Sequence, residues 1–317
     1  MNGASEMDKR CRVIYFNNCW FTNVGEAFID IGSLQLIKNI LPNAVIACAS
    51  DMTNYYYNSI SKKNGEPFLF RSDNRKVIAD FYENLECDYI ILSGMFATSL
   101  FLNTQGRIMV DSFLKRGAKL IFLGLGGCTY EDKEVSDFSR YIESTKPVLV
   151  MTRDDITYNN YKDISNCISG IDCAFWADES FSPQGFGNGE YDVITFNRSS
   201  EPEGLDTGEV KIVRPWHMQY TLEIENCRKG FFVSDTPYDY LTLYANARRV
   251  FTDLVHATIV SLMYGVPVKY WYFDKRSSAF DALKIDNRDG WLKLDHNDLE
   301  IKRETIQERI VSELKMQ

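Results

Sequence analysis

Short apolar runs alternate with amphipathic segments of helical length through the first half of the chain. Each run is bounded by polar or turn-forming residues, which predicts strands at 12–17, 44–48, 88–93, 119–123 and 148–151. Apolar residues recur with the period of an α-helix at 24–40, 73–85, 104–116 and 131–145. Strands that alternate with helices in this way predict a parallel sheet with helices on both faces.

A second alternation follows a break in composition. Residues 178–190 contain Pro183 and three glycines, which predicts a linker. Strands are then predicted at 192–196, 211–213, 230–233, 250–251 and 268–272, with helices between the later ones and a last helix over 298–315. We therefore expect an α/β protein of two similar domains that face each other across a cleft, residues 1–177 and 190–317, with the C-terminal helix in the second.

Charge and composition narrow the class of partner. The chain has 317 residues, 45% of them apolar and 25% charged, as in ordinary globular proteins. A net charge of −9 argues against nucleic acid, which requires a basic face. An anionic ligand would need a local group of cations. The basic residues near the end of the second domain could form that group or a solvated face: Arg248, Arg249, Lys269, Lys275 and Arg276.

Eight cysteines and three histidines show no spacing typical of a metal site. We expect free thiols in a reducing cytosol, no metal and no cofactor. No apolar run reaches 18 residues, and the first eleven residues are polar rather than signal-like. The expectation is a cytoplasmic protein that can touch the inner face of the membrane. Its oligomeric state is left open.

The segment from Val250 to Lys275 is the strongest candidate for a site because it predicts a strand, a helix and a second strand. Thr252 and Asp253 are residue types that cap helices. His256 then falls in the first turn, where free N–H groups and the helix dipole favour an anion. Lys275 follows the next strand. Both side chains would lie at the carboxyl edge of a parallel sheet, where ligands bind.

The first predicted strand leads into Asn23, Val24, Gly25 and Glu26 at the start of a helix. Gly25 would let a ligand approach the backbone. Glu26 either meets the occupant of the cleft or complements the helix dipole, and the sequence leaves both open. For Asp30, one turn later, we favour the dipole.

Polar and glycine residues follow other strands of the first domain. Gly124, Gly126 and Gly127 follow one of them, which marks either the substrate edge or an ordinary tight turn. Arg153 follows the strand at 148–151, and its planar fork suits a carboxylate or phosphate. Its alternative role is an ion pair with Asp154 or Asp172.

Several motifs follow one another along the chain: NVGEAFIDIG at 23–32, LGLGG at 123–127, MTRDDIT at 151–157, GIDCAF at 170–175, TDLVHATIVSLMYGVPV at 252–268, and then Lys275. In this order they resemble the polysaccharide pyruvyl transferase family. The chain also departs from the family pattern. Glu26 stands where aspartate is usual, Leu254 and Val255 replace Arg-Leu before the histidine, and the first glycine cluster is reduced to Ser93-Gly94-Met95.

The resemblance implies two Rossmann-like domains in a GT-B-like arrangement, with the acceptor on the N-terminal side and phosphoenolpyruvate on the C-terminal side. It implies transfer of pyruvate to two hydroxyls of a cell-surface polysaccharide or its lipid-linked precursor, as a cyclic ketal. Phosphoenolpyruvate would contact Arg153, His256 and Lys275. His256 would donate a proton and Glu26 would accept one.

The acceptor is expected near Trp20, Asn23, Gly25 and Glu26 and along the loop 95–102. Aromatic residues of that loop either stack on a sugar or pack into the core, and both remain open. Two rival functions also remain: a GT-B nucleotide-sugar glycosyltransferase, and a catalytically inactive partner in polysaccharide assembly, suggested by Leu254 in place of arginine.

Overall fold

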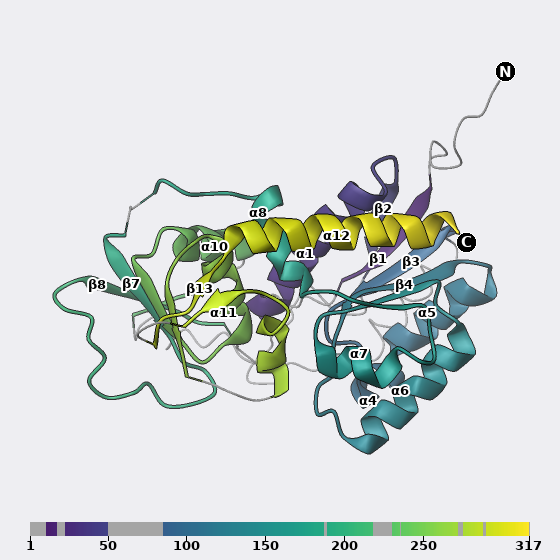
Figure 1. Cartoon of the computed structure of the whole chain (residues 1–317), viewed down its shortest axis with the longest axis horizontal. Helices are drawn as coiled ribbons and strands as arrows, with labels where there is room; N and C mark the ends of the chain where they lie inside the picture. Colours follow the sequence, from purple (N-terminus) through teal and green to yellow (C-terminus); the bar gives the residue numbers. More distant parts are fainter. Residues whose placement is uncertain are drawn as a thin grey trace, which may run out of the picture.

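The computed structural model contains two parallel sheets, seen on the right and left of Figure 1. The first has the strand order β2-β1-β3-β4-β5-β6 and the second the order β11-β10-β7-β8-β9. The described residues are 11–17, 23–49, 85–186, 189–217, 230–234, 236–271, 275–287 and 290–316. The helix predicted at 73–85 lies outside them except for its last residue.

The predicted strands are present within two residues at each end. In the first sheet they are β1 Arg12–Phe16, β2 Val45–Ala49, β3 Tyr89–Ser93, β4 Lys119–Leu125, β5 Leu149–Thr152 and β6 Cys167–Ser169. In the second they are β7 Tyr191–Thr195, β8 Lys211–Pro215, β9 Phe231–Phe232, β10 Arg249–Thr252 and β11 Val268–Tyr270. A small antiparallel pair, β12 Ile285–Asp286 and β13 Lys293–Leu294, follows. The sequence did not predict β6, β12 or β13, which are too short to show a period.

Helices connect the strands. They are α1 Val24–Ile40, α4 Ser99–Leu102, α5 Gln105–Lys115, α6 Asp132–Thr145, α7 Asp155–Tyr161, α8 Ala177–Ser180, α10 Pro237–Ala245, α11 Val255–Met263 and α12 His296–Lys315. The described residues also form the 3-10 helices η2 Cys173–Trp176 and η3 Lys275–Phe280. Some begin at side-chain caps: Asp154 accepts the Thr157 N–H at 2.7 Å, and Asp295 caps α12. None of the described helices is long and apolar enough to cross a membrane.

The first sheet is buried on both faces because its apolar side chains alternate. Val13 and Tyr15 of β1 join one core cluster, whereas Ile14 and Phe16 join the other, beneath α5 and α6. The first cluster continues into the second sheet through residues such as Val250. The two sheets therefore share one apolar core.

Helix α1 lies between the two sheets and is the main contact across them. It packs on η2 and α8 after the first sheet, and on α10 and α11 of the second. Phe28 of α1 is fully buried and meets the rings of His217 and Tyr244 edge to face. The N-terminus of α1 is thereby fixed at the junction of the two halves.

Helix α12 returns from the second sheet to the first and runs across both halves of the molecule in Figure 1. Its Arg303 is 2% exposed and donates hydrogen bonds to the carbonyl of Phe175 and to carboxylates of Asp178 and Glu300. Near the other end, Glu313 accepts a hydrogen bond from Asn166. These contacts anchor the segment that leads from the first sheet into the second.

We predict that Arg303→Met lowers the free energy of unfolding by about 2–3 kcal/mol, since it leaves a buried carbonyl and a carboxylate without their donor. Urea unfolding followed by circular dichroism measures this. Arg309→Met is the matched control, because the Arg309–Glu313 pair lies on the same helix with its arginine exposed and should cost less than about 1 kcal/mol. Equal losses in the two variants would contradict the assigned role of Arg303.

Candidate functional site

A pocket opens where the N-terminus of α1 meets the ends of strands from both sheets. This position follows from parallel topology, which collects the carboxyl ends of strands at one edge. The pocket is lined by Asn23, Gly25, Glu26, Ile29, Met95, Arg153, Arg198, His217, Leu254, Val255 and His256. It therefore unites Arg153, His256 and the Asn23-Gly25-Glu26 motif, which lie far apart in the sequence.

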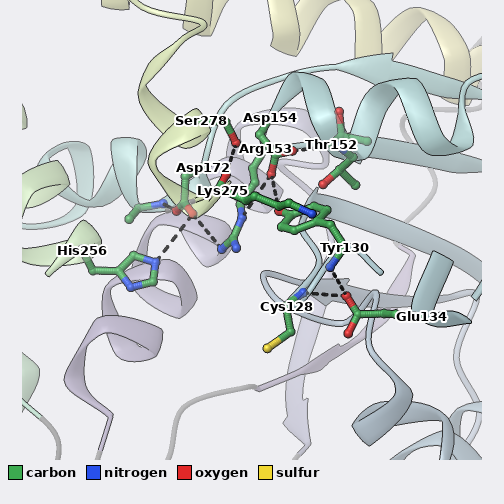
Figure 2. Close-up of polar contacts among 12 residues, drawn as sticks. Cys128, Tyr130, Glu134, Thr152, Arg153, Asp154, Asp172, His256, Lys275 and Ser278 are labelled. Atoms are coloured by element: carbon green, nitrogen blue, oxygen red, sulfur yellow. Dashed lines mark hydrogen bonds and ion pairs between the residues drawn. The ribbon is translucent and has the colours of Figure 1, made fainter. Parts of the chain in front are cut away.

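Asp172 connects the two halves of this pocket. Its Oδ2 lies 3.4 Å from Nη1 of Arg153 and 3.6 Å from Nε2 of His256, and its Oδ1 accepts the Ala174 N–H at 2.9 Å (Figure 2). Burial alone would raise the pKa of Asp172, but His256, Arg153 and the Ala174 N–H keep it below its ordinary value. One ionised carboxylate therefore holds a cation of the first sheet and a histidine of the second.

Arg153 makes both of the ion pairs that the sequence offered as an alternative to ligand binding. Its Nε lies 3.7 Å from Asp154, whose Oδ2 accepts a hydrogen bond from Tyr130 at 3.0 Å. Burial would lower the pKa of Arg153, but the charges of Tyr130, Asp172 and Asp154 raise it above its ordinary value. Within the described part of the chain, Nε of Arg153 and Nε2 of His256 are buried without a hydrogen-bond partner. Contacts of 3.6–3.7 Å are too long to be hydrogen bonds, so both groups also remain suited to a ligand.

Gly126 provides the space for the Arg153 guanidinium. A Cβ at this position would lie 2.1 Å from Nε and 2.5 Å from Cζ of Arg153. The lack of a Cβ at Gly126 therefore allows the close approach of a site residue, a role that the sequence analysis did not name.

We predict that Gly126→Ala displaces Arg153, lowers the free energy of unfolding by about 1–3 kcal/mol and weakens anion binding. Thermal unfolding with and without added phosphate measures both effects. Gly117→Ala is the control: Gly117 has φ of +95° but nothing within 4 Å of the added atom, so it should strain the backbone without changing phosphate binding. Unchanged phosphate binding in Gly126→Ala would contradict the assignment.

His256 lies in the first turn of α11, as predicted. The expected capping is wrong, because Leu254 is the N-cap and no side chain caps the helix. Thr252 Oγ1 instead accepts the Leu254 N–H. The Asp253 carboxylate accepts the Asn197 N–H from the loop after β7. The imidazole packs against Gly25, where a Cβ would lie 2.6 Å from Nδ1. The lack of a side chain at Gly25 thus allows α1 to contact His256 of the second half of the protein.

Glu26 projects into the pocket from the first turn of α1 and is 8% exposed. Burial and the nearby charge of Asp30 raise its pKa to about 8, although Asn23 and Arg153 oppose the shift. Glu26 therefore carries its proton at neutral pH. Asp30 itself is buried and accepts a hydrogen bond from Tyr15 at 2.6 Å.

Two polar residues of the pocket were missed by the sequence analysis. His217 is buried against Tyr244, and burial followed by the charge of His256 lowers its pKa to about 3, so its ring stays neutral. Its carbonyl accepts the Val24 N–H at the start of α1. Arg198 follows β7, just as Arg153 follows β5, so the pattern of a basic residue after a strand could have identified it.

Of the two roles left open for the cations near the end of the second sheet, a group at the pocket is not observed for Arg248, Arg249, Lys269 and Lys275. Arg248 and Arg249 pair with the buried Asp192 at the amino end of β10, opposite the edge that carries His256. Lys269 stacks over Trp271 and Trp291. Arg248, Arg249 and Lys269 therefore make contacts within the second half of the protein instead of lining the pocket.

Lys275 is exposed at the start of η3 and does not line the pocket. Helix η3 packs against α7, which begins two residues after Arg153. Ser278 donates a hydrogen bond to the Lys275 carbonyl at 2.6 Å (Figure 2). Lys275 is therefore not among the residues that line the pocket with His256.

Of the two roles left open for the aromatic residues of the loop 95–102, packing into the core is the one observed for both phenylalanines. Phe96 and Phe101 are buried and pack edge to face with each other, with ring centroids 5.1 Å apart. Met95 lines the pocket, and Leu100 is exposed. Trp20 and Phe21 lie outside the described residues.

Two further findings concern metals and thiols. In the described segments, no group of three or more His, Cys, Asp or Glu side chains could hold a metal ion. The cysteines of the described segments are free thiols: Cys11, Cys48, Cys87, Cys128, Cys167 and Cys173.

Comparison with known families gives a match over most of the chain. The family model described as polysaccharide pyruvyl transferase matches residues 23–268, which include every residue that lines the pocket. No curated protein matches the chain.

Solved structures share the architecture at low sequence identity. A putative UDP-N-acetylglucosamine 2-epimerase from Listeria monocytogenes is 13% identical, with a TM-score of 0.52 over 82% of this chain and 79% of that chain. The UDP co-structure of S. aureus MnaA is 10% identical, with a TM-score of 0.54 over 96% and 91%. The UDP-GlcNAc 2-epimerase from Neisseria meningitidis bound to UDP-GlcNAc is 13% identical, with a TM-score of 0.52 over 86% and 85%. These similarities concern the fold alone and confirm the predicted GT-B-like arrangement.

Proposed function

Because this chain belongs to the polysaccharide pyruvyl transferase family, we propose that it transfers pyruvate from phosphoenolpyruvate to a sugar of a cell-surface polysaccharide or its lipid-linked precursor. The product is a cyclic ketal that joins two hydroxyls of the sugar. The coarser conclusion, a transferase of polysaccharide pyruvylation, rests on the family match.

The observation that carries the proposal is the convergence of Arg153 and His256 on Asp172 in the pocket that Glu26 also lines. Phosphoenolpyruvate carries a phosphate and a carboxylate, and an arginine fork together with a helix N-terminus suits such groups. The first hydrogen bond of α11 runs from Thr258 N–H to the Leu254 carbonyl, so the N–H groups of residues 255–257 precede the ladder of the helix. A neutral Glu26 adds no repulsion toward an anion.

The reaction requires one proton donor and one acceptor. Protonation of the methylene carbon makes C2 electrophilic, and the first sugar hydroxyl adds to C2 and loses its proton. The bond between C2 and the phosphate oxygen then breaks. The second hydroxyl closes the ketal, and its proton leaves with the phosphate. The two hydroxyl protons thus balance the new methyl hydrogen and the protonated phosphate.

The pKa of Glu26 favours the reverse of the roles expected from the sequence. A carboxyl group with a pKa of about 8 starts protonated at neutral pH and suits the donor to the methylene carbon. His256 faces the ionised Asp172, which would orient the ring and stabilise the imidazolium, so it suits the acceptor of the hydroxyl proton. We propose these roles for the two residues. Asn23 and Gly25, on the α1 side of the pocket, are proposed to contact the acceptor.

A ligand titration tests the donor. Thermal unfolding is measured with phosphoenolpyruvate, pyruvate, inorganic phosphate and a panel of nucleotide sugars. We expect phosphoenolpyruvate to raise the melting temperature more than phosphate or pyruvate does, and Arg153→Lys to reduce that shift because the planar fork is lost.

The same titration separates the rival functions. A shift with nucleotide sugars and none with phosphoenolpyruvate would favour a glycosyltransferase and contradict the proposal. Absence of any shift would favour a catalytically inactive partner. Peripheral contact with the inner face of the membrane is proposed only for the case of a lipid-linked acceptor.

A further inference from the structure

The second sheet has a topological switch point at the pocket. Its strand order places β10 and β7 side by side, with Thr252 paired to Thr195, while the chain leaves these strands toward opposite edges of the sheet. Crevices at the carboxyl ends of such strands are where α/β proteins bind ligands. Two loops meet here: residues 196–199 after β7, and Asp253 with Leu254 after β10.

Asp253 fixes the first of these loops. Its fully buried carboxylate accepts the N–H groups of Asn197, Arg198 and Ser199 at 3.0, 2.8 and 2.7 Å. The Ser199 hydroxyl donates a fourth hydrogen bond at 3.0 Å. Bonds to an ionised acceptor are the stronger kind, so the backbone that carries Arg198 is ordered before any ligand arrives.

The pocket needs a cation besides Arg153. The charge of Arg153 is already balanced by Asp154 at 3.7 Å and Asp172 at 3.4 Å, and His256 faces the same Asp172. These groups alone give the site no excess of positive charge for a phosphate. Position 254, which also lines the pocket, holds a buried leucine where the family pattern has arginine. Arg198 lines the same pocket from the neighbouring loop.

We propose that Arg198 supplies the positive charge that Leu254 lacks and contacts the phosphate of the donor, with Asp253 as the positioning residue that aims it. The identity of the donor rests on the function proposed above, whereas the anion-binding role of Arg198 does not. The anion would be held between Arg198 of the second sheet and Arg153 of the first.

Binding of phosphoenolpyruvate and of inorganic phosphate to purified variants tests this by calorimetry. Arg198→Ala should weaken binding of phosphoenolpyruvate by ~10- to 100-fold, the effect of one charge-assisted contact. Arg198→Lys should lose less, because it keeps the charge. In the double variant Arg198→Ala/Leu254→Arg, the arginine at 254 should recover part of the lost affinity. Arg214→Ala, an arginine of β8 that pairs with Glu201, is the control and should bind as the unmodified protein does.

Asp253 is tested by a double-mutant cycle. Asp253→Asn should weaken binding through Arg198, so adding Arg198→Ala should cause little further loss. Additive losses would show that Asp253 only supports the fold.

Failure of this inference and failure of the proposed function give different results. If phosphoenolpyruvate binds the unmodified protein and Arg198→Ala equally, within about two-fold, the role of Arg198 is wrong and the function stands. If phosphate binds but phosphoenolpyruvate binds no better, the donor is wrong, and loss of phosphate binding in Arg198→Ala still supports the inference. If neither ligand binds, both are overturned.

Discussion

Glu26→Gln should lower turnover by ~10²- to 10⁴-fold while changing the dissociation constant of phosphoenolpyruvate only a few-fold. The substitution keeps the size of the side chain and its neutrality at pH 7, but removes the transferable proton. Initial rates of phosphate release together with calorimetry separate the two effects. Glu26→Asp is the matched variant and should retain more activity, since it keeps an acid at this position.

The dependence of turnover on pH shows whether Glu26 donates or accepts the proton. If Glu26 must carry its proton, turnover falls as the pH rises through about 8, and Glu26→Gln loses this limb. A rate that instead rises through about 8 would show that Glu26 acts as the base. Loss of donor binding equal to the loss of turnover would show that Glu26 only shapes the site.

Stability provides a check that is independent of activity. The pKa of Glu26 is higher in the folded state than its ordinary value of 4.5, so its contribution is fully present below pH 4.5 and is lost as the pH rises through about 8. Relative to the unmodified protein, Glu26→Gln should therefore be more stable at alkaline than at acidic pH. Urea unfolding on both sides of this window measures the change.

Asp172→Asn should also lower turnover without weakening the binding of phosphoenolpyruvate. It removes a negative charge beside Arg153, so binding of phosphoenolpyruvate should be unchanged or tighter. It also removes the charge that faces His256, so turnover should fall by ~10²-fold or more. Steady-state kinetics with varied phosphoenolpyruvate measures the split between kcat and KM.

Asp155→Asn is the matched control for Asp172→Asn. Asp155 is an exposed residue in the first turn of α7, close to Arg153 in sequence. Its substitution should leave both constants unchanged. If Asp172→Asn weakens donor binding in proportion to turnover, Asp172 serves mainly to hold the donor site together.

The sequence predicted those parts of the fold that depend on local periodicity. Strands β1 and β3–β5 were recognisable because both faces are buried and the runs are continuously apolar. Glu26, Arg153 and His256 were found because each follows a predicted strand, and the ends of parallel strands share an edge.

Other features depend on contacts between distant residues. Asp172 follows β6, a three-residue strand too short to show a period, and its role arises only when Arg153 and His256 meet. His217 joins the pocket through packing against α1, which no local pattern reveals. Hydrophobicity alone also did not decide whether Phe96 and Phe101 face a sugar or the core.

The direction of a strand explains why two of the basic residues do not reach the pocket. Arg248 and Arg249 are close to His256 in sequence, but they lie at the amino end of β10 and His256 follows its carboxyl end. The chain runs along the full length of β10 between them. Arg248 and Arg249 are therefore separated from His256 despite their nearness in sequence. Arg198 and Arg153 come from different sheets, but both line the pocket.

The most direct test is analysis of the product formed in D₂O from phosphoenolpyruvate and a panel of synthetic and lipid-linked hexosides. Mass spectrometry and NMR should show a sugar that carries a pyruvate ketal, with one deuterium in its methyl group and one phosphate released per ketal. Release of phosphate without a ketal, or transfer of a sugar from a nucleotide sugar to the same acceptors, would contradict the account.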